Sequence, residues 1–74
     1  MAKKSAAESV YRVTEVIGTS SVSWEDAAKN AVTTASKTLR DLRVAEISKL
    51  DLTVENGKVV AYRARVQLSF KYQA

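Results

Sequence analysis

NGKVVAYRARVQLSFKY, residues 56–72, is the most regular pattern in the chain. From Val60 onward apolar and polar side chains alternate, which is the period of a strand with one buried face. The apolar positions of this strand are Val60, Tyr62, Ala64, Val66, Leu68, Phe70 and Tyr72. Asn56-Gly57 opens the stretch and is a strong signal for a two-residue hairpin. The pattern therefore predicts another long strand, which precedes the hairpin turn and pairs antiparallel with the strand that starts near Val60.

Residues 43–55 supply that preceding strand. Ala45 and Ile47 lie in one phase of the alternation, and the apolar residues at 50, 52 and 54 lie in the other. A strand that changes phase contains an extra residue or changes face. We therefore expect a β-bulge or a change of face near Ser48-Lys49.

A further strand is predicted at the start of the chain, over residues 10–17. This run is rich in β-branched residues and contains no breaker. Tyr11, Val13 and Ile17 share one face of it, and Glu15 is the polar exception on that face. Gly18-Thr19-Ser20-Ser21 consists of turn formers, so we expect the strand to end there.

A helix is predicted to follow, with Ser23 as its N-cap and Asp26 completing a short capping box. An apolar stripe at steps of three and four runs along it, which is the helical period. Its members are Trp24, Ala27, Ala28, Ala31, Ala35, Leu39 and Leu42. Lys37 and Arg40 are expected near the far end, where cations suit the helix dipole.

The order of these elements is β-α-β-β, an α+β fold with one helix on a three-stranded antiparallel sheet. We assign residues 9–74 to a single domain and residues 1–8 to a flexible lead. With 74 residues, such a domain has a marginal core of its own. A strand of 13 residues spans roughly 43 Å, which exceeds the length of the helix. The strands should therefore leave apolar surface for another subunit.

Composition excludes several function classes. The chain has no Cys and no His, so thiol and imidazole chemistry are absent. The net charge is +4, but no Arg/Lys cluster is interleaved with aromatic residues, so nucleic-acid binding is not favoured. No apolar run is long enough for a membrane span, and no signal-peptide core follows the N-terminal lysines. We expect a cytoplasmic protein with no membrane partner.

Several residues allow a structural and a functional interpretation. Trp24 is either an anchor for the helix start, which we favour, or a surface for ligand stacking. Residues 18–21 fail the P-loop pattern, although their amides could hold an anion at the helix start. Arg63 and Arg65 lie two apart and suit either ion pairs or an anionic ligand. The strand carboxylates are either partners of Lys and Arg or ligands of a cation; they are Glu15, Glu46, Asp51 and Glu55.

The chain resembles the dodecins from Tyr11 to Tyr72. The matching segments are YRVTEVIGTS at 11–20, KTLR at 37–40, RVAEI at 43–47 and YRARVQLSF at 62–70. The resemblance implies a hollow homododecamer that stores or sequesters a small ligand and has no enzymatic activity. Flavin is the usual ligand of the family, and some members carry coenzyme A.

The positions that match the flavin clamp of the family are altered here. Val44 stands where a Trp stacks on the flavin ring, Ala45 where an aromatic residue often follows, and Arg63 where a Gln bonds the flavin edge. Val44 offers no π surface, so flavin in the usual stacked mode is not expected. The Ser-Trp-Glu and Arg-Val-Ala segments look more like the calcium-dodecin branch. The alternative is flavin or coenzyme A bound by another route through Arg63 and Arg65.

Overall fold

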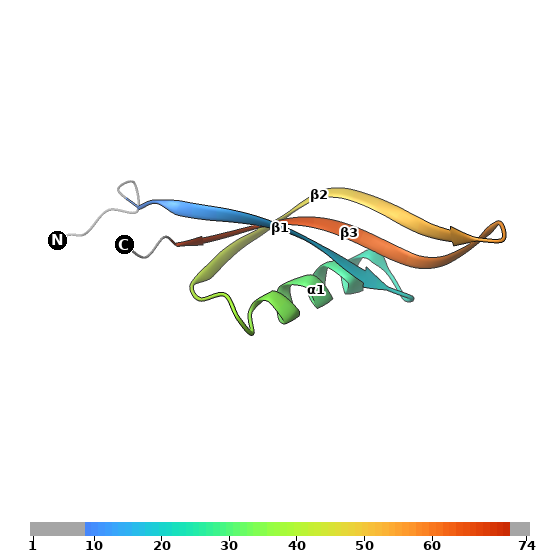
Figure 1. The fold of residues 1–74 in the computed structure, drawn as a ribbon, viewed down its shortest axis with the longest axis horizontal. Coiled ribbons are helices and arrows are strands. Elements are labelled where there is room, and N and C mark those ends of the chain that lie inside the picture. Colours follow the sequence, from blue (N-terminus) through green and yellow to red (C-terminus); the bar gives the residue numbers. More distant parts are fainter. Residues whose placement is uncertain (1–8, 72–74) are drawn as a thin grey trace.

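A computed structural model describes residues 9–71. Its elements are, in order, β1 (Tyr11–Ser20), α1 (Trp24–Ala35), β2 (Leu42–Glu55) and β3 (Lys58–Lys71) (Figure 1). The strands form one antiparallel sheet in the order β1-β3-β2. This confirms the predicted α+β fold of β-α-β-β order. The expected flexible lead, residues 1–8, and the predicted strand residue Tyr72 lie outside the described residues.

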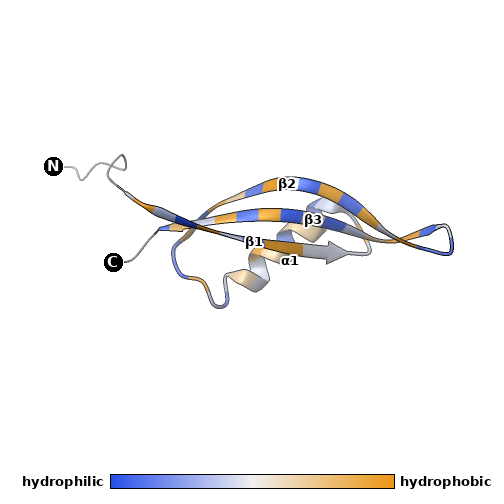
Figure 2. Ribbon diagram, turned by 45° about the horizontal axis from the view of Figure 1, so that its top comes forward, coloured by the Kyte–Doolittle hydropathy of each residue, from blue (hydrophilic) through white to orange (hydrophobic). Residues whose placement is uncertain are grey.

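The central strand β3 divides the sheet into two faces. Ala64, Val66 and Leu68 are fully buried against α1, as the alternation predicted. From α1, Ala27 and Ala31 complete this core. We call this side of the sheet the helix face. The opposite side, which carries the side chains of Arg63, Arg65 and Gln67 and of their neighbours in register, is the open face. The same alternation is visible as bands of hydropathy along β2 and β3 (Figure 2).

β1 continues through Gly18 to Ser20, so the turn predicted at residues 18–21 was placed too early. Gly18, Thr19 and Ser20 are paired with β3 instead of turning. A Cβ added at Gly18 would overlap the carbonyl oxygen of Ala27 and lie 2.8 Å from the Cβ of Ala31. Gly18 therefore serves the close approach of helix and strand, not a turn.

α1 ends at Ala35, which is earlier than the apolar stripe suggested. The hydroxyl of Ser36 donates to the carbonyl oxygen of Val32 at 2.8 Å, and the chain then tightens into turns. Thr and Ser are weak helix formers, and they are frequent in this segment. The prediction that Lys37 and Arg40 lie at the end of the helix was wrong, since no basic residue lies in its last turn. Leu39 and Leu42, the last residues of the stripe, still pack against the core.

The β2–β3 hairpin has the predicted turn. Asn56 and Gly57 both have positive φ, at 52° and 75°, as a type I′ turn requires. β2 contains three register shifts, at Leu42/Val44, Ile47/Lys49 and Thr53/Val54. The second of these confirms the irregularity predicted near Ser48-Lys49.

The described chain is elongated, with extents of 58 × 21 × 17 Å. The hairpin of β2 and β3 extends well beyond α1, as expected from the strand lengths (Figure 1). Much apolar surface of the described chain is consequently exposed. The exposed large apolar residues are Val10, Tyr11, Val13, Ile17, Val22, Val44, Ile47, Leu50, Leu52, Val54, Val59 and Val60.

Candidate functional site

The open face carries most of the candidate site residues, and the strand register arranges them in rows across the sheet. Residues paired across neighbouring strands have side chains on the same face. The rows, read from β1 through β3 to β2, are Glu15–Gln67–Glu46, Ile17–Arg65–Lys49 and Thr19–Arg63–Asp51. An acidic row thus lies next to a basic row, and a row with one charge of each sign follows.

Asp51 and Arg63 form a bidentate ion pair. Nε of Arg63 donates to Oδ1 of Asp51 at 2.7 Å, and Nη2 donates to Oδ2 at 2.9 Å. This hydrogen bonding lowers the pKa of Asp51, with a partial opposing effect of desolvation and further lowering by the charges of Arg63 and Arg65. The same pair raises the pKa of Arg63. Arg63 is therefore committed to a partner within its own chain.

The four candidate carboxylates do not converge within one chain. Oε2 of Glu15 accepts a hydrogen bond from Nε2 of Gln67 at 2.6 Å, and Glu46 lies on the other side of Gln67. Glu55 is at the end of β2 opposite Lys58. In residues 9–71 no group of three or more acidic, His or Cys side chains is gathered where it could hold a metal ion.

The positions matching the flavin clamp are also dispersed. Val44 is paired with Ser69 and Arg63 with Asp51, and Ser69 lies six positions after Arg63 on β3. At about 3.3 Å per residue this is about 20 Å. Ala45 is paired with the buried Leu68 and so belongs to the helix face. One chain therefore cannot bring Val44 and Arg63 to the same small ligand.

Trp24 anchors the start of α1 on the sheet. Its Nε1 donates to the carbonyl oxygen of Asp51 at 3.0 Å. Its ring packs edge-on against that of Tyr62, with centroids 5.3 Å apart. These contacts confirm the anchoring role favoured from the sequence, since both polar and aromatic parts of the side chain are engaged by β2 and β3.

The chain between β1 and α1 forms an ordinary cap. The hydroxyl of Ser20 accepts the amide of Val22 at 2.9 Å and donates to Oδ2 of Asp26 at 2.7 Å. The hydroxyl of Ser23 accepts the amide of Asp26 at 3.0 Å, as the predicted N-cap requires. Because side chains already satisfy amides here, nothing supports the anion site considered for this segment.

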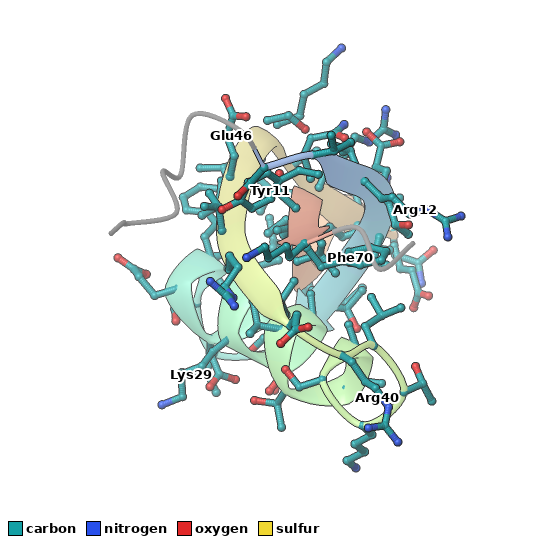
Figure 3. All side chains as sticks on the ribbon, turned by 90° about the vertical axis from the view of Figure 1, so that its left-hand side faces the viewer. Tyr11, Arg12, Lys29, Arg40, Glu46 and Phe70 are labelled. Atoms are coloured by element: carbon teal, nitrogen blue, oxygen red, sulfur yellow. The ribbon has the colours of Figure 1, made fainter. Side chains whose placement is uncertain are left out.

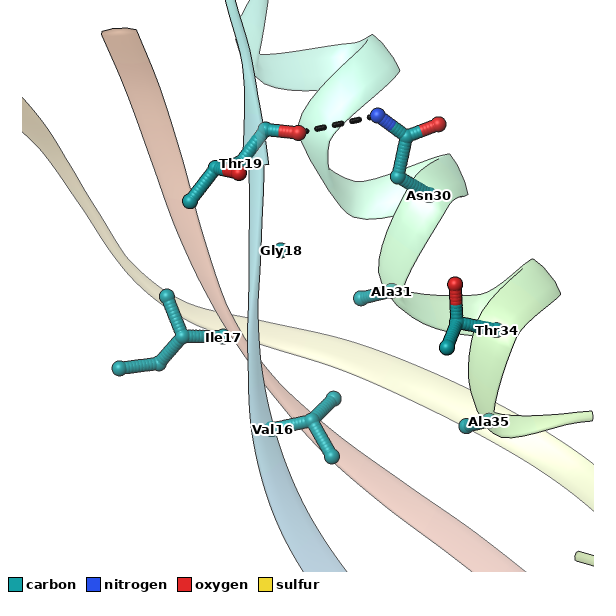
Figure 4. A pocket seen from close by; sticks show the side chains of 8 residues that line it. All are labelled: Val16, Ile17, Gly18, Thr19, Asn30, Ala31, Thr34 and Ala35. Carbon is teal, nitrogen blue, oxygen red and sulfur yellow. Dashed lines mark hydrogen bonds between the residues drawn. The ribbon is translucent and has the colours of Figure 1, made fainter. Parts of the chain in front are cut away.

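A shallow hollow of about 290 Å³ lies beside this segment, between β1 and α1. Figure 4 shows its wall of small side chains and the hydrogen bond from Nδ2 of Asn30 to the carbonyl oxygen of Thr19, at 2.9 Å. None of its lining side chains is charged. The hollow therefore contains none of the carboxylates or arginines that the sequence singled out.

Sequence reasoning missed Gln67 and Lys49. Both become notable only through the residues beside them, because Gln67 lies between Glu15 and Glu46 and Lys49 lies opposite Arg65. Counting back from the Asn56-Gly57 turn would have suggested partners in a regular hairpin. That count gives the observed partner of Gln67, Glu46, but it pairs Lys49 with Ala64 instead of Arg65, because the register shifts of the hairpin cancel only beyond Lys49.

Comparison with known proteins gives one consistent relationship. A model of the dodecin family matches residues 10–73. The calcium dodecin of Mycobacterium tuberculosis is 43% identical over 63 residues, which are 85% of this chain and 89% of that protein. Within residues 9–71, no helix is long and apolar enough to cross a bilayer.

Solved structures agree with that relationship. The dodecin of Streptomyces coelicolor superposes with a TM-score of 0.85 at 38% identity, covering 92% of this chain and 97% of that one. The crystal structure of the calcium-chelating calcium dodecin of M. tuberculosis superposes with a TM-score of 0.77 at 43% identity, covering 86% and 91%.

Proposed function

This chain belongs to the dodecin family, and from that premise we propose that it is a non-enzymatic, cytoplasmic protein that assembles into a homododecamer and binds a small ligand or ion. The ion we favour is calcium. Neither a nucleic acid nor a membrane is part of the proposal.

The assembly is supported by the balance of buried and exposed apolar side chains. The core of the described subunit consists of Ala27, Ala31, Ala64, Val66 and Leu68, three of which are alanines. Larger side chains such as Ile17, Ile47 and Leu50 remain close to half exposed. Burying apolar surface is worth about 25 cal/mol per Å², so copies of this chain gain stability by covering one another. A domain of this size commonly needs such support.

The acidic row is the observation that carries the choice of calcium. Glu15 and Glu46 flank Gln67 on the open face, and calcium prefers carboxylate and amide oxygens. Because calcium takes six to eight oxygens, this row needs ligands from further copies or from water. Closed symmetric assemblies repeat each residue around their axes and so can supply such ligands. Asp51 and Glu55 remain candidates, but Asp51 already binds Arg63.

Stacked flavin is not part of the proposal. Val44 provides no aromatic surface, and Arg63 is held by Asp51 instead of being available to a flavin edge. The alternative function is sequestration of flavin or coenzyme A through a different pocket. The observation that favours it is the cationic pair of Arg65 and Lys49 on the open face, since both of these ligands have phosphate-bearing forms.

Native mass spectrometry of the purified protein tests this proposal directly. We expect a mass of twelve subunits, with calcium retained after desalting and released by a chelator. A well-folded monomer at micromolar concentration contradicts the assembly. A protein that is yellow as purified, with quenched flavin fluorescence, favours the alternative.

A further inference from the structure

Two cationic side chains face each other across β2 and β3. Lys49 is the register partner of Arg65, and both project from the open face, because Arg65 alternates with the buried Ala64 and Val66. Cβ atoms of such partners are about 5 Å apart. Like charges placed directly opposite each other destabilise a sheet, so this arrangement has a cost unless something negative lies between them.

Three carboxylates lie in the rows on either side of this pair: Asp51, Glu15 and Glu46. Asp51 is bound at both oxygens by Arg63, and Glu15 accepts a hydrogen bond from Gln67. In the described part of the chain, neither Lys49 nor Arg65 takes part in an ion pair. Asp51 does experience the charge of Arg65 as well as that of Arg63, so this carboxylate already interacts with two arginines.

The local backbone builds this opposition. The register shift between Ile47 and Lys49 turns Lys49 onto the open face. The hydroxyl of Ser48, the residue inside the shift, donates to the carbonyl oxygen of Arg65 at 3.2 Å. Bulges often redirect a side chain for a purpose. Here a bulge places Lys49 beside Arg65.

We propose that Lys49 and Arg65 form a binding site for a phosphate dianion on the open face. The planar guanidinium of Arg65 can donate two parallel hydrogen bonds to phosphate oxygens, and Lys49 adds a mobile point charge. Two positive charges match the dianion. On the other side of Arg65 lies Ile17, which is 45% exposed. It gives an apolar flank to a phosphomonoester, so free phosphate and an ester share the same chemistry here.

This inference goes beyond the proposed calcium role and does not depend on it. The calcium row and the phosphate pair use different residues, Glu15 and Glu46 in one case and Lys49 and Arg65 in the other. Calcium and phosphate titrations of the same variants therefore report on the two sites separately.

The test is calorimetric titration of the assembled protein with inorganic phosphate at low ionic strength. We expect saturable binding with one phosphate per chain. Lys49→Gln and Arg65→Gln should each weaken it about tenfold, the loss of one charge-assisted interaction, and Arg65→Lys should fall between parent and Arg65→Gln. The control is Lys29→Gln, because Lys29 projects from α1 away from the sheet (Figure 3). It should change the affinity less than about twofold.

Melting curves guard against a folding artefact. Lys49→Gln removes a like-charge contact, so without phosphate it should melt at or above the temperature of the parent. Phosphate should raise the melting temperature of the parent more than that of this variant. Absence of saturable phosphate binding in the parent overturns the proposal. So does a loss of phosphate affinity in Lys29→Gln as large as that in Lys49→Gln, because it would indicate attraction by net charge alone.

Phenyl phosphate distinguishes the two sources of the anion. If an ester is the better ligand, it should bind more tightly than inorganic phosphate, and Ile17→Ala should remove the difference. Equal affinities in the parent assign the site to the phosphate group alone. Failure of both ligands to bind overturns the proposal.

Discussion

Asp51 is joined to Arg63 through its side chain and to Trp24 through its main chain. The carboxylate accepts two hydrogen bonds from the guanidinium, at 2.7 and 2.9 Å, on the open face. The carbonyl oxygen accepts from Nε1 of Trp24 at 3.0 Å on the helix side. This one residue of the edge strand β2 thus ties the central strand and the start of α1 together.

The ion pair should make the stability of the protein depend on acidic pH. The pKa of Asp51 is lowered in the folded state from its ordinary value of 3.8. The stabilisation is therefore fully present above that value and is lost as the pH falls through the lower folded-state pKa. Asp51→Asn should melt below the parent at pH 7, and the difference should disappear on acidification. Melting curves across this pH range measure it.

Glu55→Gln is the control for this effect. Glu55 forms no ion pair with another described residue. The difference in melting temperature between Glu55→Gln and the parent should therefore not disappear on acidification in the way expected for Asp51→Asn. Because Asp51 is exposed and Arg63 is partly exposed, we expect a small effect on the melting temperature. A difference between Asp51→Asn and parent that stays constant down to the lowest pH contradicts the role of the pair.

Gly18→Ala should destabilise the protein strongly for so small a change. The added methyl group would overlap the carbonyl oxygen of Ala27, a main-chain atom that no change of rotamer can move. Overpacking of this kind costs about 1–3 kcal/mol. Urea denaturation measures it. The control is Gly57→Asn at the hairpin, where nothing lies within 4 Å of the added Cβ and φ is +75°; Asn tolerates that conformation.

Flavin binding should improve in the double variant Val44→Trp with Arg63→Gln. The indole restores a stacking surface, worth about 0.5–1.5 kcal/mol beyond burial. Because Val44 and Arg63 lie about 20 Å apart along the sheet of one chain, the gain should appear in the assembled protein and not in a dissociated subunit. Riboflavin fluorescence titration measures it. Equal affinity of double variant and parent would show that these two positions do not exclude flavin.

Calcium should raise the melting temperature of the assembly, and Glu15→Gln should reduce that rise. A cation at a hundred times its dissociation constant stabilises the folded state by about 2.7 kcal/mol. Asp51→Asn should have the smaller effect on the calcium response, because its carboxylate is already bound by Arg63. Differential scanning calorimetry with calcium or chelator measures both. If millimolar calcium leaves the curve of the parent where the chelator does, the calcium proposal is wrong.

The candidate site could be predicted from the sequence only in part. Arg63, Arg65, Glu15 and Asp51 attract attention by residue type and by their place on strands. Which of them are partners does not follow from that. A shift of one residue in register moves a side chain to the other face, and β2 contains three such shifts.

The order of elements, the third strand and the hairpin follow from the sequence alone, whereas the central place of that strand comes from the sheet topology. The alternation from Val60 to Phe70 has the period of a strand, and Asn56-Gly57 supplies the two positive φ angles of the turn, so both depend on local chemistry. The tertiary structure alone decided two other features: the role of Gly18 and the opposition of Lys49 and Arg65. Each of these depends on contacts between segments distant in the chain, whose geometry local propensity does not specify.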